Sequence, residues 1–407
     1  MSTGRLMARR RRALVIGGSI GGLFSARRLM RDGWDVDVFE RSPVELAARG
    51  AGIVTQPQVI ASLSALGLPV TPDLGVDVSR RQTLDRSGRV IAETVRPQVA
   101  TSWNRLFGIL RSGFPGSRYH LGRDLVGISQ DEGDVTATFA DGESVSGDLL
   151  IGADGFRSSV RRIFAPEAQP RYAGYVAWRG LVEEAAFSPE LHRRMFDFFS
   201  FGLPPEEQIL GYPVAGDEAG RRYNFVWYRP VDEARELPGL LTDEAGHQHH
   251  VSIPPPLIAR HVTAEMRRHA DAVFAPQFRE IIRLTEQPFL QPIYDLESSR
   301  MAFGRTALIG DAAFVARPHV GAGTAKAADD AMCLADALRG GNDLGSALAR
   351  FETERLATGR RIVEQARHLG TYMQRDFATE AERLRAERHR SPEAVMAETA
   401  LLDFLNA

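Results

Sequence analysis

A glycine-rich turn near the N-terminus limits the possible folds of this chain more than any other feature. The apolar run 13–16 is typical of a buried strand, the segment Gly17-Gly18-Ser19-Ile20-Gly21-Gly22 forms a tight turn, and a helical pattern follows. A strand that turns directly into a helix points several backbone N–H groups at one place, where they can bind a pyrophosphate. We therefore expect an α/β fold with a Rossmann-like unit at its start.

A carboxylate follows the second strand of this unit at the spacing typical of dinucleotide binding. The helix ends near Gly33, and the next strand, 36–40, ends in Glu40. A carboxylate about 20 residues after such a turn accepts hydrogen bonds from a ribose hydroxyl, although Glu40 could instead only cap its strand. Ser19 replaces the usual middle glycine, but it is small and its hydroxyl can bond a phosphate oxygen. The predicted cofactor residues of this unit are Gly17, Ser19, Ile20, Gly22, Glu40 and Arg41.

Two more short segments with a Gly-Asp or Ala-Asp pair follow predicted strands. The run 149–151 leads into Gly152-Ala153-Asp154-Gly155, and the run 306–309 leads into Gly310-Asp311. A carboxylate at a strand end can accept from a polyol hydroxyl. The positive N-terminal end of the long helix that opens after Pro318 can stabilise negative charge on a ligand. Each segment alone is a weak signal, but their order along the chain predicts one site. Its further residues are Asp154, Asp311, Pro318, Gly321, Ala322 and Gly323.

The region after residue 170 has a different pattern. Its strands are rich in aromatic and β-branched residues, as in 175–178 and 223–228, and no strand–helix alternation accompanies them. This pattern predicts a second, sheet-based domain that interrupts the first. We expect a discontinuous nucleotide-binding domain at 10–70, 99–170 and 296–345, a substrate domain at 71–98 and 171–295, and a C-terminal helical region at 346–407.

Composition argues against several classes of protein. A formal net charge of −2 over 407 residues gives no support for nucleic-acid binding. No apolar run approaches the roughly 18 residues of a membrane helix, and no signal peptide follows Met1, so we expect a cytoplasmic protein. Cys333 is the only cysteine, which excludes an internal disulfide and fits a reducing compartment. His247, His249 and His250 lie in a polar loop without a carboxylate at ligand spacing, so we predict no metal site.

Together the motifs resemble those of flavoprotein aromatic hydroxylases with the para-hydroxybenzoate hydroxylase fold. The likeness rests on 17–22 with Glu40, on 152–161, and on Gly310-Asp311 with 318–323. The middle motif is the most specific, because it is known in this family and is not a general nucleotide turn. The segments 175–180, 224–228 and 316–319 are similar to the 2,6-dihydroxypyridine hydroxylase subgroup, in which Ser19 is a normal variant. Trp103 departs from the family, many of whose members place an arginine or glutamine near the flavin there.

The resemblance implies a function. Members of the family bind FAD, reduce it with NADH or NADPH, and use O2 to hydroxylate a small aromatic or N-heteroaromatic ring through a flavin C4a-hydroperoxide. A hydroxypyridine-like ring is the expected substrate here. The resemblance also ties Asp154 and Arg161 to FAD and reductant binding, and it implies no separate nicotinamide domain.

Substrate residues are harder to predict. His319 precedes the predicted helix start that faces the flavin, so it is our candidate catalytic residue, although a lone histidine can also be structural. Tyr212, Tyr223 and Tyr228 lie in the predicted substrate sheet and are candidates for substrate contact. Packing in the core is the alternative for each of them.

Two other functions are open to a chain of this kind. A flavin halogenase needs a Trp-x-Trp segment, and Trp34, Trp103, Trp178 and Trp227 do not occur at that spacing. A catalytically silent flavin-binding or ligand-sensing protein on the same fold is the remaining alternative, and substrate-stimulated NAD(P)H oxidation would separate it from an enzyme. The expected partners are a small aromatic substrate and O2, and a homodimer is left open.

Overall fold

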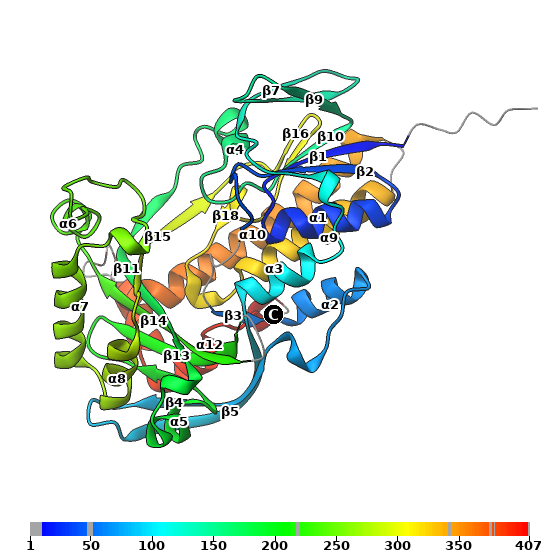
Figure 1. Ribbon diagram of the computed structural model, residues 1–407. Coiled ribbons are helices and arrows are strands. Elements are labelled where there is room, and N and C mark those ends of the chain that lie inside the picture. The colour runs from blue at the N-terminus through cyan, green and yellow to red at the C-terminus, as the bar shows by residue number, and fades with distance from the viewer. Residues whose placement is uncertain are drawn as a thin grey trace, which may run out of the picture.

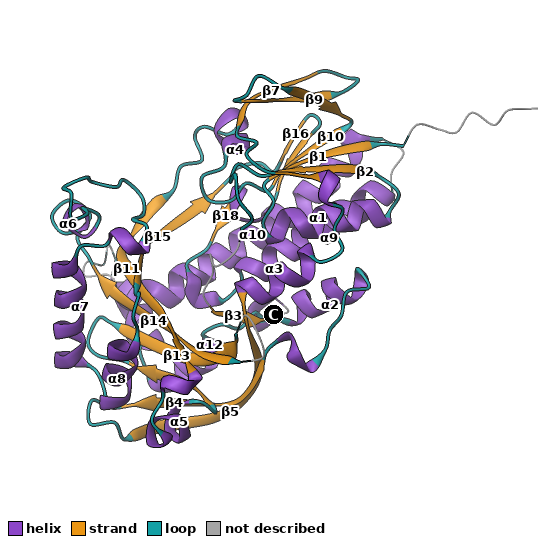
Figure 2. Cartoon of the chain, in the orientation of Figure 1, coloured by secondary structure: helices purple, strands orange, loops and turns teal. Residues whose placement is uncertain are grey.

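Two large sheets dominate the computed structural model, which describes residues 10–46, 52–216, 220–340, 343–373, 377 and 379–405. Figure 1 places the sheet with β1, β2 and β10 in the upper part of the view, and the sheet with β11, β13 and β14 in the lower left part. Figure 2 shows the helices that cover them, including a group around α1, α3 and α9 between the two. The predicted α/β fold class with a Rossmann-like part and a second sheet is confirmed.

The first sheet has six strands and a parallel centre. β1 pairs in parallel with both β2 and β10, and β10 pairs in parallel with β17. Apolar residues fill these central strands because helices cover them, as is usual for parallel sheets. In order across the sheet the strands are β16 (Ala302–Phe303), β17 (Thr306–Leu308), β10 (Leu149–Gly152), β1 (Arg12–Ile16), β2 (Asp35–Phe39) and β6 (Tyr119–His120).

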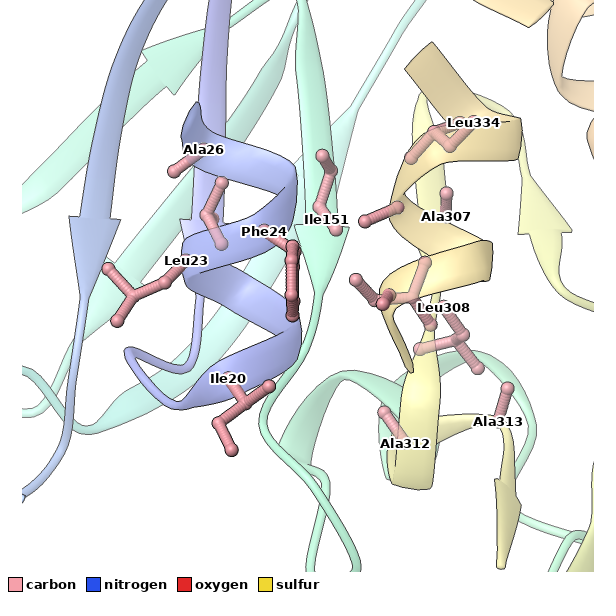
Figure 3. Close-up of a cluster of buried hydrophobic side chains, with 14 of the residues drawn as sticks. Ile20, Leu23, Phe24, Ala26, Ile151, Ala307, Leu308, Ala312, Ala313 and Leu334 are labelled. Carbon is pink, nitrogen blue, oxygen red and sulfur yellow. The ribbon is translucent and has the colours of Figure 1, made fainter. Parts of the chain in front are cut away.

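Two helices from opposite ends of the sequence pack beside each other on this sheet. α1 (Ile20–Arg31) and α9 (Gly323–Arg339) form one hydrophobic cluster with β10 and β17. Figure 3 shows Phe24 of α1 between Leu23 and the strand residue Ile151, with Leu308 and Leu334 on the other side of the cluster. In this cluster the start of the chain packs against its last third. The packing holds together the strand ends that carry the predicted motifs.

The second sheet has nine strands and two buried faces. Its outer face packs on α7 (Arg260–Val273) and α8 (Pro276–Leu284), and its inner face packs on the C-terminal segments. In order the strands are β18 (Phe314–Val315), β15 (Phe289–Glu297), β11 (Arg171–Glu183), β14 (Arg221–Pro230), β13 (Gln208–Ala215), β12 (Phe198–Gly202), β4 (Val76–Leu84), β5 (Val90–Ser102) and β3 (Gly52–Thr55).

The remaining elements connect or cover these sheets. A small sheet holds β7 (Leu125–Gln130), β8 (Val135–Phe139) and β9 (Ser144–Gly147). The other helices are α2 (Pro57–Ala65), α3 (Trp103–Arg111), α4 (Ser159–Phe164), α5 (Pro189–Met195), α6 (Leu237–Leu240), α10 (Leu344–Gly370), α11 (Glu380–His389) and α12 (Pro392–Glu398). None of the helices in the described ranges is both long and apolar enough to cross a membrane.

The division into domains stays a prediction. The nine-stranded sheet takes most of its strands from 71–98 and 171–295, as that division expects. Two short strands, β3 and β18, come from segments that we had placed in the nucleotide-binding domain. Each of them follows a strand of the six-stranded sheet in the chain, β3 after β2 and β18 after β17.

Candidate FAD and substrate site

The predicted cofactor residues gather at one edge of the six-stranded sheet. β17, β10, β1 and β2 are neighbours and run in parallel, so their carboxyl ends lie side by side. Gly17 follows β1, Glu40 follows β2, Asp154 follows β10 and Asp311 follows β17. In an open parallel sheet, ligands bind in the crevice outside these strand ends. Four motifs that are far apart in sequence therefore face one crevice.

The first turn requires glycine at its two outer positions. Gly17 has a φ of +103°, and a Cβ on it would lie 2.4 Å from the carbonyl oxygen of Ala153. A Cβ on Gly22 would lie 1.9 Å from the carbonyl oxygen of Gly17. Both distances are far inside van der Waals contact with backbone, which cannot move aside cheaply. The side chain of Ser19 forms no capping bond to α1 within the described chain, so its hydroxyl is available for a ligand.

Glu40 holds this turn in place. Its side chain is 6% exposed, and its Oε2 accepts a hydrogen bond from the backbone N–H of Gly18 at 2.9 Å. Its Oε1 accepts from the backbone N–H of Ser42 at the same distance, 2.9 Å. Each carboxylate oxygen has a further lone pair, so contact with a ribose is compatible with these bonds and stays a prediction. Arg41, the next residue, is exposed.

A buried ion pair positions Asp311. Gly310 has a φ of +60°, and its backbone N–H donates to Oδ2 of Asp330 at 2.8 Å. Oδ1 of Asp330 accepts from Nε of Arg355 at 2.6 Å, and Asp330 is 2% exposed. The side chain of Asp311 itself is 49% exposed and borders the crevice. Sequence reasoning missed Asp330 and Arg355, although an aspartate in the apolar stripe of α9 is an anomaly that could have pointed to them.

A cavity of about 630 Å³ joins the cofactor edge to the nine-stranded sheet. One wall carries Asp311 and the start of α9, and the opposite floor is the inner face of β11, β13, β14 and β15. This size suits a ligand pocket for small molecules. The wall residues include Asp311, Pro318, Gly321, Ala322, Gly323 and Thr324. The floor residues include Arg179, Leu210, Tyr212, Val226, Tyr228 and Gln291.

Proteins of known function are similar to this chain in sequence and in structure. The model of a family described as FAD binding domain-like matches residues 172–295. The 2,6-dihydroxypyridine 3-monooxygenase of Paenarthrobacter nicotinovorans is 35% identical over 366 residues, which cover 89% of this chain and 91% of that protein. The structure of 2,6-dihydroxypyridine-3-hydroxylase from Arthrobacter nicotinovorans has a TM-score of 0.86 at 34% identity, and the match covers 91% of this chain and 95% of that one.

The chain belongs to the FAD-dependent aromatic hydroxylases.

A second group of relatives supports the same assignment. The FAD-dependent urate hydroxylase of Klebsiella pneumoniae is 31% identical over 372 residues, which cover 88% of each protein. A Klebsiella pneumoniae protein crystallised with FAD and uric acid has a TM-score of 0.75 at 25% identity, covering 95% of this chain and 97% of that one. The predicted family, the dependence on FAD and the flavin monooxygenase activity on aromatic rings are therefore confirmed.

Two buried polar groups of this hydroxylase suit FAD as the ligand. The side chain of Lys326 is 1% exposed, and its ammonium nitrogen lies 3.7 Å from Oδ1 of Asp311, yet this nitrogen forms no hydrogen bond within the described ranges. Oδ2 of Asp154 accepts from the backbone N–H of Ser159 at 2.6 Å, whereas its Oδ1 has no partner among the described residues. Unsatisfied buried groups are costly, and a cofactor rich in phosphate and hydroxyl groups offers the acceptors and donors that they lack. Sequence reasoning missed Lys326.

Arg161 connects two of the motifs. Its guanidinium donates to the carbonyl oxygen of Ala312 at 3.0 Å and to that of Phe156 at 2.7 Å. The motif at 152–161 is thereby bound to the loop that carries Asp311. Burial lowers the pKa of Arg161, and the charges of Asp154 and Asp311 oppose that shift. Arg161 therefore stabilises the cofactor edge as a cation beside two carboxylates.

The tyrosines of the second sheet divide between its two faces. Tyr212 and Tyr228 line the cavity, as a substrate contact requires. Tyr223 does not, because it points to the outer face, where it is fully buried against Phe187 and Phe196 with ring centroids 5.5 and 5.6 Å away. Successive side chains of a strand point to opposite faces, so Tyr223 cannot share a site with Tyr228. We correct the candidate set accordingly and remove Tyr223.

His319 lies behind the cavity rather than in it. It is 2% exposed, its Nε2 is 2.9 Å from the hydroxyl oxygen of Tyr175, and its ring centroid is 4.0 Å from that of Tyr228. Burial, with a smaller effect from the charge of Arg317, lowers the pKa of His319 to about 3, so the ring is neutral at physiological pH. This position does not favour the direct substrate contact that we predicted. His319 instead supports Tyr228, which does line the cavity.

Proposed function

We propose that this enzyme hydroxylates a small, hydroxylated N-heteroaromatic ring, with NADH or NADPH as reductant and O2 as oxidant. The observation that carries the proposal is the single cavity that Asp311 and the start of α9 share with Arg179, Tyr212 and Tyr228. A ring on this floor would lie in the same cavity as a cofactor held at the strand ends. The 35% identity to a 2,6-dihydroxypyridine 3-monooxygenase supports a hydroxypyridine-like substrate.

The cofactor edge has residues suited to each part of FAD. The turn from Gly17 to Gly22 would take the pyrophosphate, Glu40 the ribose and Asp311 the polyol chain, with Lys326 as a nearby positive charge. The entry to α9 between Pro318 and Gly323 would direct its positive end at the ring system. When bound and reduced by NAD(P)H, FAD supplies the activation of molecular oxygen.

The residues of the chain would contribute orientation and a dry environment. Leu210 and Val226 give the floor an apolar surface that excludes water. Burial raises the pKa of Tyr212 to about 12 and that of Tyr228 further, so both phenols keep their protons at neutral pH. Each hydroxyl group can therefore donate a hydrogen bond to an oxygen or ring nitrogen of the substrate. His319 would keep the ring of Tyr228 in place.

A substrate screen tests the proposed function. Hydroxylated pyridines, urate-like rings and simple phenols would be added to the FAD-loaded enzyme, and the rate of NAD(P)H oxidation measured together with incorporation of labelled oxygen by mass spectrometry. We expect one hydroxypyridine to stimulate oxidation and to gain one oxygen atom. If no ring stimulates NAD(P)H oxidation, the silent flavin-binding or ligand-sensing alternative holds instead.

Three broader expectations complete the proposal. A cytoplasmic location is supported by the single cysteine, Cys333, which fits a reducing compartment.

The domain division at 10–70, 99–170 and 296–345 against 71–98 and 171–295 is supported by the two large sheets. A homodimer is an open alternative to a monomer, and the molar mass measured by light scattering would decide between them.

A further inference from the structure

Arg179 differs from two other arginines near the nine-stranded sheet, Arg229 and Arg317, in the partner of its charge. On the outer face, Arg229 forms an ion pair with Glu265 at 3.1 Å. Next to the inner face, Arg317 forms one with Asp295 at 2.9 Å. Arg179 forms no ion pair with any carboxylate that the structure describes. Its NH1 donates to the neutral amide oxygen of Gln291 at 3.0 Å. Arg179 therefore places a positive charge in this sheet, and no described carboxylate compensates it.

This charge lies on the floor of the cavity. In the sheet, Arg179 is paired with Val226 of β14 on one side and with Phe289 of β15 on the other. All three residues line the cavity, and the guanidinium carbon lies 5.6 Å from the ring centroid of Phe289. The Nε atom is buried and has no hydrogen-bond partner among the described residues. One edge of the guanidinium is thus held by Gln291, while Nε–H remains unsatisfied.

Among the residues that the structure describes, the surroundings of Arg179 add no negative charge at this end. The two phenols that share the floor, Tyr212 and Tyr228, are neutral. Burial raises the pKa of each, and the nearby charge of Arg179 lowers it by a smaller amount. Asp311 is the one carboxylate among the described cavity-lining residues, and it lies on the opposite wall beside Lys326. Arg157, which also lines the cavity, donates to the hydroxyl of Ser252. The floor is therefore a positive surface that also carries two phenolic hydroxyl groups.

An unpaired guanidinium in a partly buried cavity is costly, and an anion that enters the cavity removes that cost. We infer that Arg179, held by Gln291, binds a negatively charged oxygen of the aromatic substrate, either an ionised ring hydroxyl or a ring carboxylate. The enzyme would then select acidic rings over neutral rings of the same size. This inference rests on the proposed function only in that the substrate ring occupies this cavity.

The inference also explains how the ring would be oriented. The anionic oxygen would lie at the guanidinium on β11, and the hydroxyl groups of Tyr212 and Tyr228 would hold further polar atoms of the ring. The opposite edge of the ring would then point away from the floor, toward the wall formed by Asp311 and the start of α9. An electron-rich, ionised ring is also the better acceptor of an electrophilic oxygen.

Matched ligand pairs test this inference on the FAD-loaded enzyme. Benzoate against benzamide tests a carboxylate, and 2,6-dihydroxypyridine against unsubstituted pyridine tests an ionisable hydroxyl. Dissociation constants would be measured by calorimetry for the wild type, Arg179→Met and Arg179→Lys, with Arg229→Met as the control on the other face. We expect the wild type to prefer the acidic member of at least one pair by about ten- to a hundred-fold. Arg179→Met should lose that preference, and Arg179→Lys and Arg229→Met should keep most of it.

A second variant covers the case in which Arg179→Met does not fold. Gln291→Glu keeps the guanidinium of Arg179 and almost the same side-chain shape at position 291. The new carboxylate replaces the amide oxygen that now lies 3.0 Å from NH1 of Arg179. It should therefore abolish the preference for acidic rings. The inference is overturned if the wild type shows no such preference in either pair, or if Gln291→Glu and a folded, FAD-loaded Arg179→Met both keep it.

The outcomes also separate this inference from the proposed function. If acidic rings bind through Arg179 but no ring stimulates NAD(P)H oxidation, the binding inference stands and the proposed function fails. If rings gain oxygen while Arg179→Met leaves the ligand preference unchanged, the proposed function stands and the inference fails.

Discussion

The two halves of the site are built in different ways. At the cofactor edge, the geometry comes from backbone: Gly17 and Gly22 allow a turn that no larger residue permits, and Glu40 bonds backbone N–H groups. On the floor of the substrate cavity, the geometry comes from side chains such as Tyr212 and Tyr228, which project from separate strands. A backbone site needs particular residues next to each other in sequence, whereas a side-chain site needs only the correct face of each strand.

One buried charge behind the cofactor edge and one on the cavity floor have different partners. Behind the cofactor edge, Asp330 is fully paired with Arg355 and with the N–H of Gly310. On the floor, the amide of Gln291 is the hydrogen-bond partner that the described part of the chain gives Arg179. A paired charge stabilises one structure, while an unpaired charge favours binding of a ligand. The following predictions test this contrast, from the largest effect to the smallest.

Breaking the buried pair should cost the most stability. Replacing Asp330 with Ala leaves the guanidinium of Arg355 buried without its partner, so we expect the free energy of unfolding to fall by about 3–5 kcal/mol. Urea denaturation measures this change. Asp336→Ala is the matched control on the same helix, because the Asp336 side chain is 60% exposed, and it should cost less than about 1 kcal/mol. Equal effects of the two variants would contradict the structural role of Asp330.

The buried histidine should make the protein sensitive to acid. The pKa of His319 is lowered to about 3 in the folded state, compared with 6.5 ordinarily, and the groups that face it are Tyr175, Tyr228 and Arg317. Below pH 6.5 the unfolded chain takes up a proton that the folded chain does not, so stability falls as the pH falls from 6.5 toward 3. At about pH 4.5 this difference amounts to about 2–3 kcal/mol.

The measurement is urea denaturation of the wild type and of His319→Gln at neutral pH and near pH 4.5. On acidification, the free energy of unfolding should fall less in His319→Gln than in the wild type, by about 2–3 kcal/mol. His261→Gln removes an exposed histidine of α7 and should behave as the wild type. A variant with the same acid sensitivity as the wild type would show that His319 is not a neutral, buried group.

The glycine turn should tolerate no added methyl group. In Gly22→Ala the new Cβ would meet the carbonyl oxygen of Gly17 at 1.9 Å, so the turn must shift and the free energy of unfolding should fall by about 1–3 kcal/mol. Gly108→Ala makes the same change in α3, where nothing lies within 4 Å, and should stabilise the protein by about 0.5–1 kcal/mol. Thermal denaturation of the two apoproteins shows whether each variant is more or less stable than the wild type. If both variants change stability in the same direction, the close approach of a Cβ at Gly22 to the carbonyl oxygen of Gly17 is wrong.

The cofactor edge should lose affinity when its exposed carboxylate is neutralised. Asp311→Asn replaces a strong, charged acceptor for the polyol chain with a neutral one, so FAD binding should weaken by about 1–3 kcal/mol, or roughly 5- to 150-fold. Quenching of flavin fluorescence during titration measures this affinity. Asp336→Asn, which does not border the cavity, should bind FAD as the wild type does. FAD affinity unchanged in Asp311→Asn would remove this residue from the cofactor site.

Much of the cofactor half could be predicted from the sequence. The turn at 17–22, the carboxylate at Glu40 and the strand ends before Asp154 and Asp311 are local patterns of a few adjacent residues. Their chemistry depends on spacing along one strand–turn–helix unit, and that spacing is visible without the fold. The ion pair of Asp330 with Arg355 was not visible, because its two residues belong to different helices.

The sequence by itself determined the α/β class, the cofactor motifs and the family. Only the tertiary structure decided which side chains face the substrate. β14 is buried on both faces, so its burial does not distinguish Tyr223 from Tyr228. The choice depends on which layer covers each face: α7 and α8 cover the outer one, while the inner one borders the cavity in which Arg179 lies. Since that layering arises from contacts between distant segments, local sequence patterns could not reveal it.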